Sequence, residues 1–147
     1  MEIYGHKLPD KLYELIKDKD RDDLPFVSAT TLRKLLPQDI KIGGGFFGGI
    51  RFDDIAGIKR ESQPGHLLDL GEIYFLASSK QQKKAITELH MLDIDNALLI
   101  AGNHDEEAIA LDYRNSSVEP RVLGSFHPKE WVLLANSFEE FAEKVGL

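Results

Sequence analysis

Four consecutive residues, His104, Asp105, Glu106 and Glu107, form the densest set of potential metal ligands in the sequence. A metal ion needs side chains that converge on one centre and that further contacts hold in place. Consecutive residues of a turn seldom converge in this way, and none of the five histidines lies within four residues of another. We therefore predict a solvated turn between two strands here, and no metal site.

A glycine-rich stretch at 43–49 contains the spacing G-x-G-x-x-G of dinucleotide-binding proteins. That motif works between a strand and a helix, because the first amides of the helix hold the pyrophosphate. Residues 50–52 instead favour a second strand, and the alternation at 40–42 favours a first one. The sequence thus predicts a hairpin turn and no bound cofactor. Phe46 and Phe47 in this turn have two interpretations: they anchor a partner, or they fold back onto the core.

Nucleophilic and hydrolytic motifs are missing from the sequence. It has no cysteine, no G-x-S-x-G elbow and no H-E-x-x-H helix. Trp131, the only tryptophan, precedes apolar residues and is expected in the core rather than on a ligand platform. We predict no catalytic residues, although a site assembled from scattered positions leaves no local pattern.

The balance of charge disfavours further classes of protein. The 147 residues carry 18 Lys and Arg against 25 Asp and Glu, a formal net charge of −7. Binding to nucleic acid or to an anionic membrane needs an excess of Lys and Arg, so both are disfavoured. Apolar runs fall well short of the roughly 20 residues of a membrane span, and residues 1–7 lack the pattern of a signal peptide. With no cysteine, these features predict a cytoplasmic protein.

Helical patterns occupy the first part of the chain. Pro9 stands where the first helix begins, and Leu12 and Ile16 continue it at helical spacing. A second short helix is expected over residues 28–36, which end before a proline. Residues 53–63 suit either a short helix or a loop.

Strand patterns dominate the second part. Residues 72–77 have strand composition, and four further strands are expected at 96–101, 108–113, 121–126 and 130–135. Their links are too short for helical crossovers, so they predict an antiparallel meander. Ser137 and Glu140 then form a capping box, which begins a helix with one apolar face. Helices before and after an antiparallel sheet give a single α+β domain over residues 1–147.

Several segments together resemble the SMI1/KNR4 family of the SUKH superfamily. They are the Leu8-Pro9 start of the first helix, Leu98-Leu99-Ile100-Ala101-Gly102-Asn103, Ile109-Ala110-Leu111-Asp112-Tyr113-Arg114, Glu119-Pro120-Arg121-Val122, and Leu134-Ala135-Asn136-Ser137-Phe138-Glu139-Glu140-Phe141. The resemblance covers both ends of the chain and is most specific from Asn96 onward. The middle of the chain, residues 17–85, contributes little to it.

The resemblance implies a fold and a class of function. The expected fold is an α+β domain with a curved antiparallel sheet flanked by N-terminal and C-terminal helices, and no enzymatic activity is established for the family. Bacterial members look largely like immunity proteins that neutralise polymorphic or contact-dependent toxins, many of them nucleases. Fungal members are instead regulators of cell-wall synthesis and signalling. A shared fold hosts many functions, so these remain expectations.

Acidic residues suggest how such a protein would meet its partner. Residues 88–147 hold 12 acids and 4 bases, whereas residues 1–87 hold 13 acids and 14 bases. The second part could therefore cover the basic surface with which a nuclease toxin holds phosphate. The candidate contacts are Asp105, Glu106, Glu107 and Asp112, with Tyr113 and Arg114 as anchors. For Asp112, a structural role at a strand end is an interpretation of equal weight.

Two other hypotheses stay open at this point. The chain is a regulatory or scaffold module that binds another cytoplasmic protein, with Phe46 and Phe47 as contacts. Alternatively, it is a small ligand-binding protein or enzyme, which would require a deep pocket with convergent polar groups.

Overall fold

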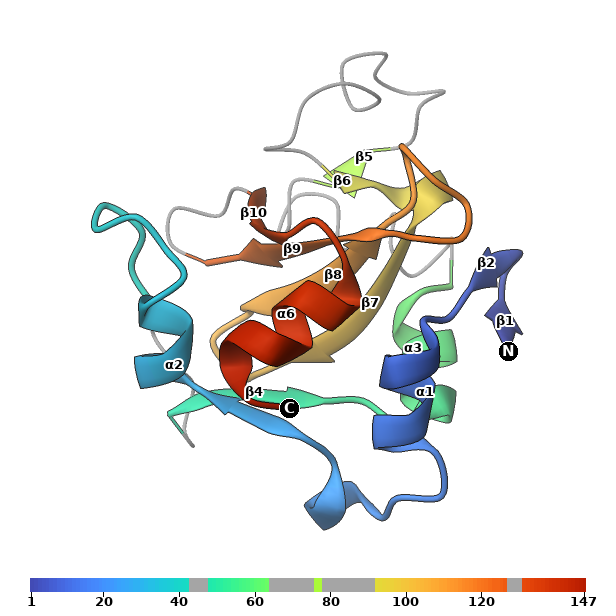
Figure 1. Ribbon diagram of the computed structural model, residues 1–147, viewed down its shortest axis with the longest axis horizontal. Helices are drawn as coiled ribbons and strands as arrows, with labels where there is room; N and C mark the ends of the chain where they lie inside the picture. The colour runs from blue at the N-terminus through green and yellow to red at the C-terminus, as the bar shows by residue number, and fades with distance from the viewer. Residues whose placement is uncertain (43–47, 64–75, 78–91, 127–130) are drawn as a thin grey trace.

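A six-stranded antiparallel sheet forms the centre of the protein (Figure 1). The computed structural model describes residues 1–42, 48–63, 76–77, 92–126 and 131–147. The strands follow the order β10-β9-β8-β7-β4-β3 across the sheet. Their bounds are β3 (Phe26–Ser28), β4 (Gly49–Phe52), β7 (Ala97–Gly102), β8 (Ala108–Asp112), β9 (Arg121–Ser125) and β10 (Trp131–Ala135).

Helices stand before, within and after this sheet. They are α1 (Asp10–Ile16), α2 (Ala29–Arg33), α3 (Ile55–Glu61) and α6 (Phe138–Val145), with short 3₁₀ turns η1 (Arg21–Asp23) and η3 (Ile94–Asn96). Two smaller strand pairs complete the described elements: the antiparallel hairpin β1 (Glu2–Ile3) and β2 (His6–Lys7), and the parallel pair β5 (Leu76–Ala77) and β6 (Leu92–Asp93). The α+β class is confirmed.

The predicted meander is confirmed as well. Strands β7, β8, β9 and β10 pair in chain order, each antiparallel to the next. The pairing register shifts between Leu99 and Ala101 in β7 and between Leu133 and Ala135 in β10. Such irregularities bend a strand and increase its twist. The sheet accordingly curls into a half-barrel, as the resemblance implied.

One face of the sheet packs against the helices. Helix α6 lies across it (Figure 1), and Phe52 of β4 meets Phe138 of α6 edge-on with ring centroids 6.1 Å apart. Ile50, two residues before Phe52, joins the same core cluster. Because side chains alternate along a strand, Arg51 faces the opposite side, and position 49, occupied by glycine, has the same orientation as Arg51.

A second apolar cluster lies on the other face of the sheet, over β7 to β10. It contains Trp131, Leu123 and Leu99, and it is joined by Leu92 and Ile94 from β6 and η3. Trp131 is buried, as expected for a core residue. This cluster covers only part of the face, because β3 and β4 contribute nothing to it.

Helix α6 begins where the sequence predicted. The hydroxyl oxygen of Ser137 accepts a hydrogen bond of 3.1 Å from the amide of Glu140. The carboxylate of Glu140 in turn accepts a hydrogen bond of 3.0 Å from the backbone amide of Asn136, the residue before the cap. Gly146 ends the helix with a φ of 79°, in the left-handed region that glycine adopts without steric cost.

The expected hairpin around the glycine-rich stretch is wrong in its partner strand. Strand β4 pairs with β3, residues 26–28, rather than with residues 40–42. Ile40 instead packs into the main core from the loop after α2. Strand β3 spans only three residues, and its last residue, Ser28, is also the N-cap of α2. It is therefore too short for the alternation of apolar and polar residues by which a strand is recognised in a sequence.

The structure also decides the expectations for residues 53–63 and 72–77. Residues 55–61 form helix α3, which settles the choice between helix and loop over 53–63. The strand expected at 72–77 is described only at Leu76–Ala77, and there it pairs in parallel with β6 rather than with the main sheet. Residues 72–75 and 78–91, like the glycine-rich residues 43–47, lie outside the described residues.

We predict that Gly49→Ala destabilises the fold. A Cβ at this position would overlap the carbonyl oxygen of Val27 and stand 2.6 Å from the Phe26 ring, so β3 must move away from β4. The free energy of unfolding in urea should fall by about 1 to 3 kcal/mol. Gly102→Ala on the neighbouring strand is the control, since its nearest contact is an ordinary 3.4 Å. Equal stability of the two variants would contradict the packing described here.

Candidate functional site

A groove of about 950 Å³ lies over β3, β4 and the adjoining end of β7. Four of its described lining residues have little or no side chain: Gly49, Ala101, Gly102 and Ala108. The groove adjoins the second apolar cluster, because Leu99 and Ala108 belong to both. The volume falls within the range of natural ligand pockets, roughly 300 to 1,000 Å³.

The first wall of the groove is an aromatic and cationic pair. Phe26 and Arg51 lie directly opposite each other on β3 and β4, and the guanidinium stands over the ring at 5.4 Å from its centroid. Arg51 also donates hydrogen bonds to the carbonyl oxygens of Leu24 at 3.0 Å and Asp22 at 3.4 Å. Arg51 is therefore held within the chain, while Phe26 remains 37% exposed.

The second wall carries a carboxylate whose pKa lies above its usual value. Asp53 follows β4, where its amide donates to the carbonyl oxygen of Ile100 at 2.9 Å. Burial raises the pKa of the Asp53 carboxyl to about 6, and repulsion from Glu61 adds to the rise, against attraction by Arg60. Within the described residues, no hydrogen bond or ion pair reaches this carboxylate.

Its neighbour Asp54 has a structural task. The side chain of Asp54 accepts a 2.7 Å hydrogen bond from the amide of Gly57 and so caps the start of helix α3. At the end of the same helix, Arg60 contacts Glu61 at 3.4 Å. Asp53 is thus the acidic residue of this wall whose side chain takes no part in such contacts among the described residues.

The turn between β7 and β8 closes one end of the groove. Asn103 organises it: its side-chain oxygen accepts from the amides of Asp105 at 2.9 Å and Glu107 at 3.2 Å. Its amide nitrogen donates to the Glu107 carboxylate at 2.8 Å and to the carbonyl of Gly49 at 3.2 Å. Glu106 adopts a φ of 60°. Asp105 and Glu106 are exposed, whereas Glu107 is fully buried.

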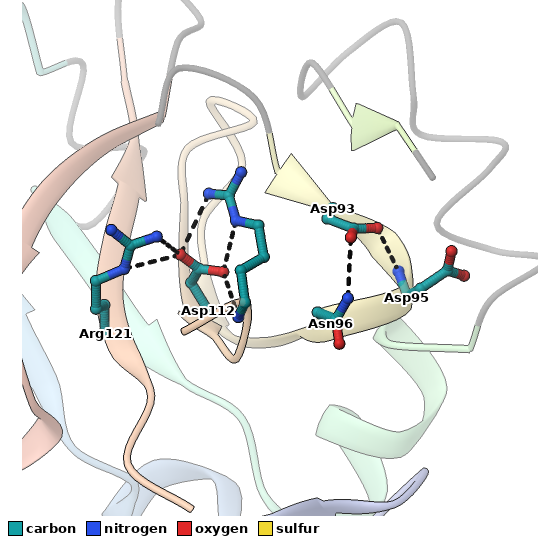
Figure 2. A network of polar contacts seen from close by, with 6 residues as sticks. Asp93, Asp95, Asn96, Asp112 and Arg121 are labelled. Atoms are coloured by element: carbon teal, nitrogen blue, oxygen red, sulfur yellow. Dashed lines mark hydrogen bonds and ion pairs between the residues drawn. The ribbon is translucent and has the colours of Figure 1, made fainter. Parts of the chain in front are cut away.

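Asp112 is buried and binds two arginines (Figure 2). It faces Arg121 across the β8–β9 pair, and its Oδ2 accepts from the Arg121 guanidinium, with Nε at 3.0 Å. Its Oδ1 accepts from the Arg114 amide at 3.1 Å and from Arg114 Nε at 2.8 Å. One carboxylate therefore holds β8, β9 and the start of their connection together. The structural interpretation of Asp112 agrees with these contacts.

A second buried carboxylate lies close by in Figure 2. Asp93 accepts from the amide of Asp95 at 3.1 Å and from the side-chain amide of Asn96 at 2.9 Å, and these bonds shape the turn η3. Such local bonds leave Asp93 inside the protein rather than on a contact surface.

Tyr113 and Arg114 also face inward. The Tyr113 hydroxyl donates to the carbonyl oxygen of Lys7 at 2.6 Å, and its ring stacks on His6 with centroids 4.6 Å apart. Burial raises the pKa of the Tyr113 hydroxyl above its usual range. The Arg114 side chain is 2% exposed. These two residues tie the β1–β2 hairpin and the β8–β9 connection to the sheet.

The predicted partner-binding residues therefore divide into three groups. Asp105 and Glu106 are exposed beside the groove. The four others, Glu107, Asp112, Tyr113 and Arg114, are held in contacts inside the chain. Phe46 and Phe47 lie outside the described residues.

Sequence reasoning missed Asp53. The pair Asp53-Asp54 precedes a helix, and a capping role for Asp54 could have been read from that place. Nothing local marks Asp53, because the groove around it exists only when β3 pairs with β4.

Comparison with protein families identifies the chain. A model of the SMI1/KNR4 family (SUKH-1) matches residues 2–144 of the 147. The chain belongs to the SMI1/KNR4 family. No curated protein and no solved structure matches it. The SMI1/KNR4 family is generally non-enzymatic, and membership suggests that this domain interacts with other proteins.

Two further features of this SMI1/KNR4 domain concern metal ligands and membrane-spanning helices within the described ranges. Across these ranges, no group of three or more His, Asp or Glu side chains has the arrangement of a metal site. Of the helices in the same part of the chain, none is long and apolar enough to cross a bilayer.

We predict that Asp53→Asn stabilises the protein at neutral pH. The folded-state pKa of about 6 lies above the usual 3.8, so the folded protein binds the proton more tightly than the unfolded chain does. Wild-type stability should therefore fall as the pH rises from about 4 to about 6, and the Asn variant should lack this loss. The expected gain above pH 7 is about 1 to 2 kcal/mol in urea unfolding, and near zero at pH 4. A variant less stable than wild type at pH 7.5 would contradict the assigned environment.

We also predict that Asp112→Asn is strongly destabilising. The substitution keeps the shape of the side chain and removes the charge that balances Arg114 and Arg121. The free energy of unfolding should fall by roughly 3 kcal/mol. Glu119→Gln removes one charge from an exposed residue of the same connection and should cost less than about 0.5 kcal/mol. Similar costs for both variants would show that the buried network is not a support of the fold.

Proposed function

We propose that this SMI1/KNR4 domain is a non-enzymatic protein-binding module, and specifically an immunity protein that neutralises a bacterial toxin by direct binding. The observation that carries the proposal is the family match over residues 2–144. A cytoplasmic protein partner with a basic surface, such as a nuclease toxin, is the partner that the charge favours. No bound cofactor is needed for a function of this kind.

The acidic surface supports the choice of a basic partner. Seven carboxylates after residue 92 are exposed or half-exposed: Asp95, Asp105, Glu106, Glu119, Glu139, Glu140 and Glu143. Two of the cations in the same part of the chain, Arg114 and Arg121, pair with the buried Asp112. Lys144 pairs with Glu140 at 2.9 Å. The negative charge at the surface thus exceeds the positive charge over these described residues.

Such a surface can inhibit without chemistry. A nuclease exposes Lys and Arg to hold phosphate, and an acidic protein that covers them blocks access of the substrate. Charge complementarity accelerates the encounter, and its effect weakens as salt screens it. Asp105 and Glu106 have the most direct role in this proposal, because both are exposed in the turn that follows His104, a residue of the groove lining.

The test asks whether a gene next to this one encodes a toxin domain and then measures binding to that domain; a neighbourhood without a toxin gene would count against the immunity proposal. We expect a stable complex in a pull-down and by calorimetry, with a dissociation constant that rises between 50 mM and 500 mM salt. Binding that ignores salt would contradict the electrostatic mechanism. No binding at any salt concentration would contradict the immunity proposal and favour a regulatory module that binds another cytoplasmic protein.

We predict that the double variant Asp105→Asn and Glu106→Asn weakens this complex. Asparagine removes each charge and tolerates the left-handed backbone of Glu106. The affinity should fall roughly threefold to tenfold, mostly through slower association. The double variant Glu2→Gln and Asp39→Asn removes the same charge from two exposed residues outside this acidic surface and should leave the affinity within about twofold. Equal losses would indicate that net charge, rather than the turn, determines binding.

A further inference from the structure

We propose that the groove over β3, β4 and β7 receives an arginine or lysine side chain of the protein partner, which pairs with the carboxylate of Asp53. This inference deepens the proposed function, because it rests on binding to a protein with a basic surface. It adds a specific subsite to a mechanism that otherwise depends on diffuse charge.

The geometry of the groove supplies the first argument. Ile50 and Phe52 of β4 belong to the main core, and Phe52 also borders the groove together with Arg51 and Asp53. The glycine and alanine residues of the lining leave room for an inserted side chain. The exposed acids of the β7–β8 turn follow directly after His104, which lines the groove.

The existing contacts supply the second argument. Arg51 is bonded to the carbonyl oxygens of Asp22 and Leu24, and Asp54 is bonded to the amide of Gly57. Arg60 contacts Glu61 at 3.4 Å. Asp53 has no such contact among the described residues, so it can accept hydrogen bonds from an incoming guanidinium or ammonium group.

The described lining of the groove holds four carboxylates and three arginines, so the preference for a cation depends on Asp53 itself. The charged groups that act on Asp53 are Glu61, Arg60 and Asp54 of helix α3 and its cap, and Arg21 of η1. Desolvation dominates their sum and raises the pKa of Asp53 to about 6. A cation inserted beside the carboxylate offsets the free-energy cost of desolvating its charge. Pairing with Asp53 is therefore more favourable than pairing with a fully exposed carboxylate.

Phe26 gives the subsite an apolar side. Its ring is partly exposed at the rim of the groove, and Arg51 already stacks against it. The methylene stem of an arginine or lysine can lie along such a ring while its charged end reaches a carboxylate. The groove therefore combines the two surfaces that a long basic side chain needs.

The first experiment measures affinity for the toxin domain encoded next to this gene. Asp53→Asn should weaken binding at least tenfold at pH 7.5, while its thermal stability rises, so that lost binding is not unfolding. Asp39→Asn makes the same substitution at an exposed residue of the loop after α2, which does not line the groove, and should bind within about twofold of wild type. Wild-type affinity in a stable Asp53→Asn variant would overturn the inference and leave the proposed function intact.

The pH dependence of the same complex gives a second readout. Wild-type affinity should fall as the pH is lowered from 7.5 to 5, because Asp53 takes up a proton in this interval. Asp53→Asn should remove that part of the pH dependence. Parallel pH profiles for the two proteins would count against pairing at Asp53.

A peptide probe separates failure of the inference from failure of the proposed function. An acetylated and amidated peptide with a central arginine should shift the backbone amide NMR signals of Gly49, Asp53 and Gly102 at millimolar concentration. The same peptide with citrulline should not, and Asp53→Asn should abolish the shifts. If wild type binds no toxin domain but shows these shifts, only the proposed function fails. If the arginine peptide leaves the groove signals unchanged, the inferred partner side chain is wrong.

Discussion

The alternation of side chains along β4 is the constraint on which both the core and the groove depend. Ile50 and Phe52 enter the main core and meet helix α6 through the contact of Phe52 with Phe138. The positions between and beside them, Gly49, Arg51 and Asp53, line the groove, which Phe52 also borders. The close approach of β3 at Gly49 then brings Phe26 to the rim. A strand that supports the fold on one side thus shapes a candidate binding surface on the other.

Charge has two separate uses in this protein. Inside, the carboxylates of Asp112 and Asp93 bind arginines, amides and an asparagine, and they fix the loops at the ends of the strands. Outside, Asp105 and Glu106 project from a turn whose shape depends on Asn103. The net charge of the sequence counts the buried carboxylates and the exposed carboxylates together. Only the exposed group can act on a partner at long range, so the acidity relevant to binding is smaller and more localised than the count suggests.

Asp53 illustrates how stability and binding oppose each other. A carboxylate in a groove, desolvated and without a bonding partner in the described residues, costs stability at neutral pH. Natural proteins keep such costs mainly at functional sites, where a ligand later compensates for them. The same residue that weakens the free protein is therefore the one best prepared for a cation. Asp54, one position further along, shows the contrasting case of a carboxylate used for the fold itself.

The sequence by itself determined the local features of this protein. It indicated the meander from residue 97 to residue 135, the cap of helix α6 at Ser137, and the family, because neighbouring residues encode these features. Only the tertiary structure decided that β4 pairs with residues 26–28 and that Asp112 and Tyr113 lie inside. Burial depends on what packs against a residue from distant parts of the chain, as His6 does against Tyr113. The groove beside Asp53 belongs to the same class, since its walls come from β3, α3 and the β7–β8 turn and meet only in the folded chain.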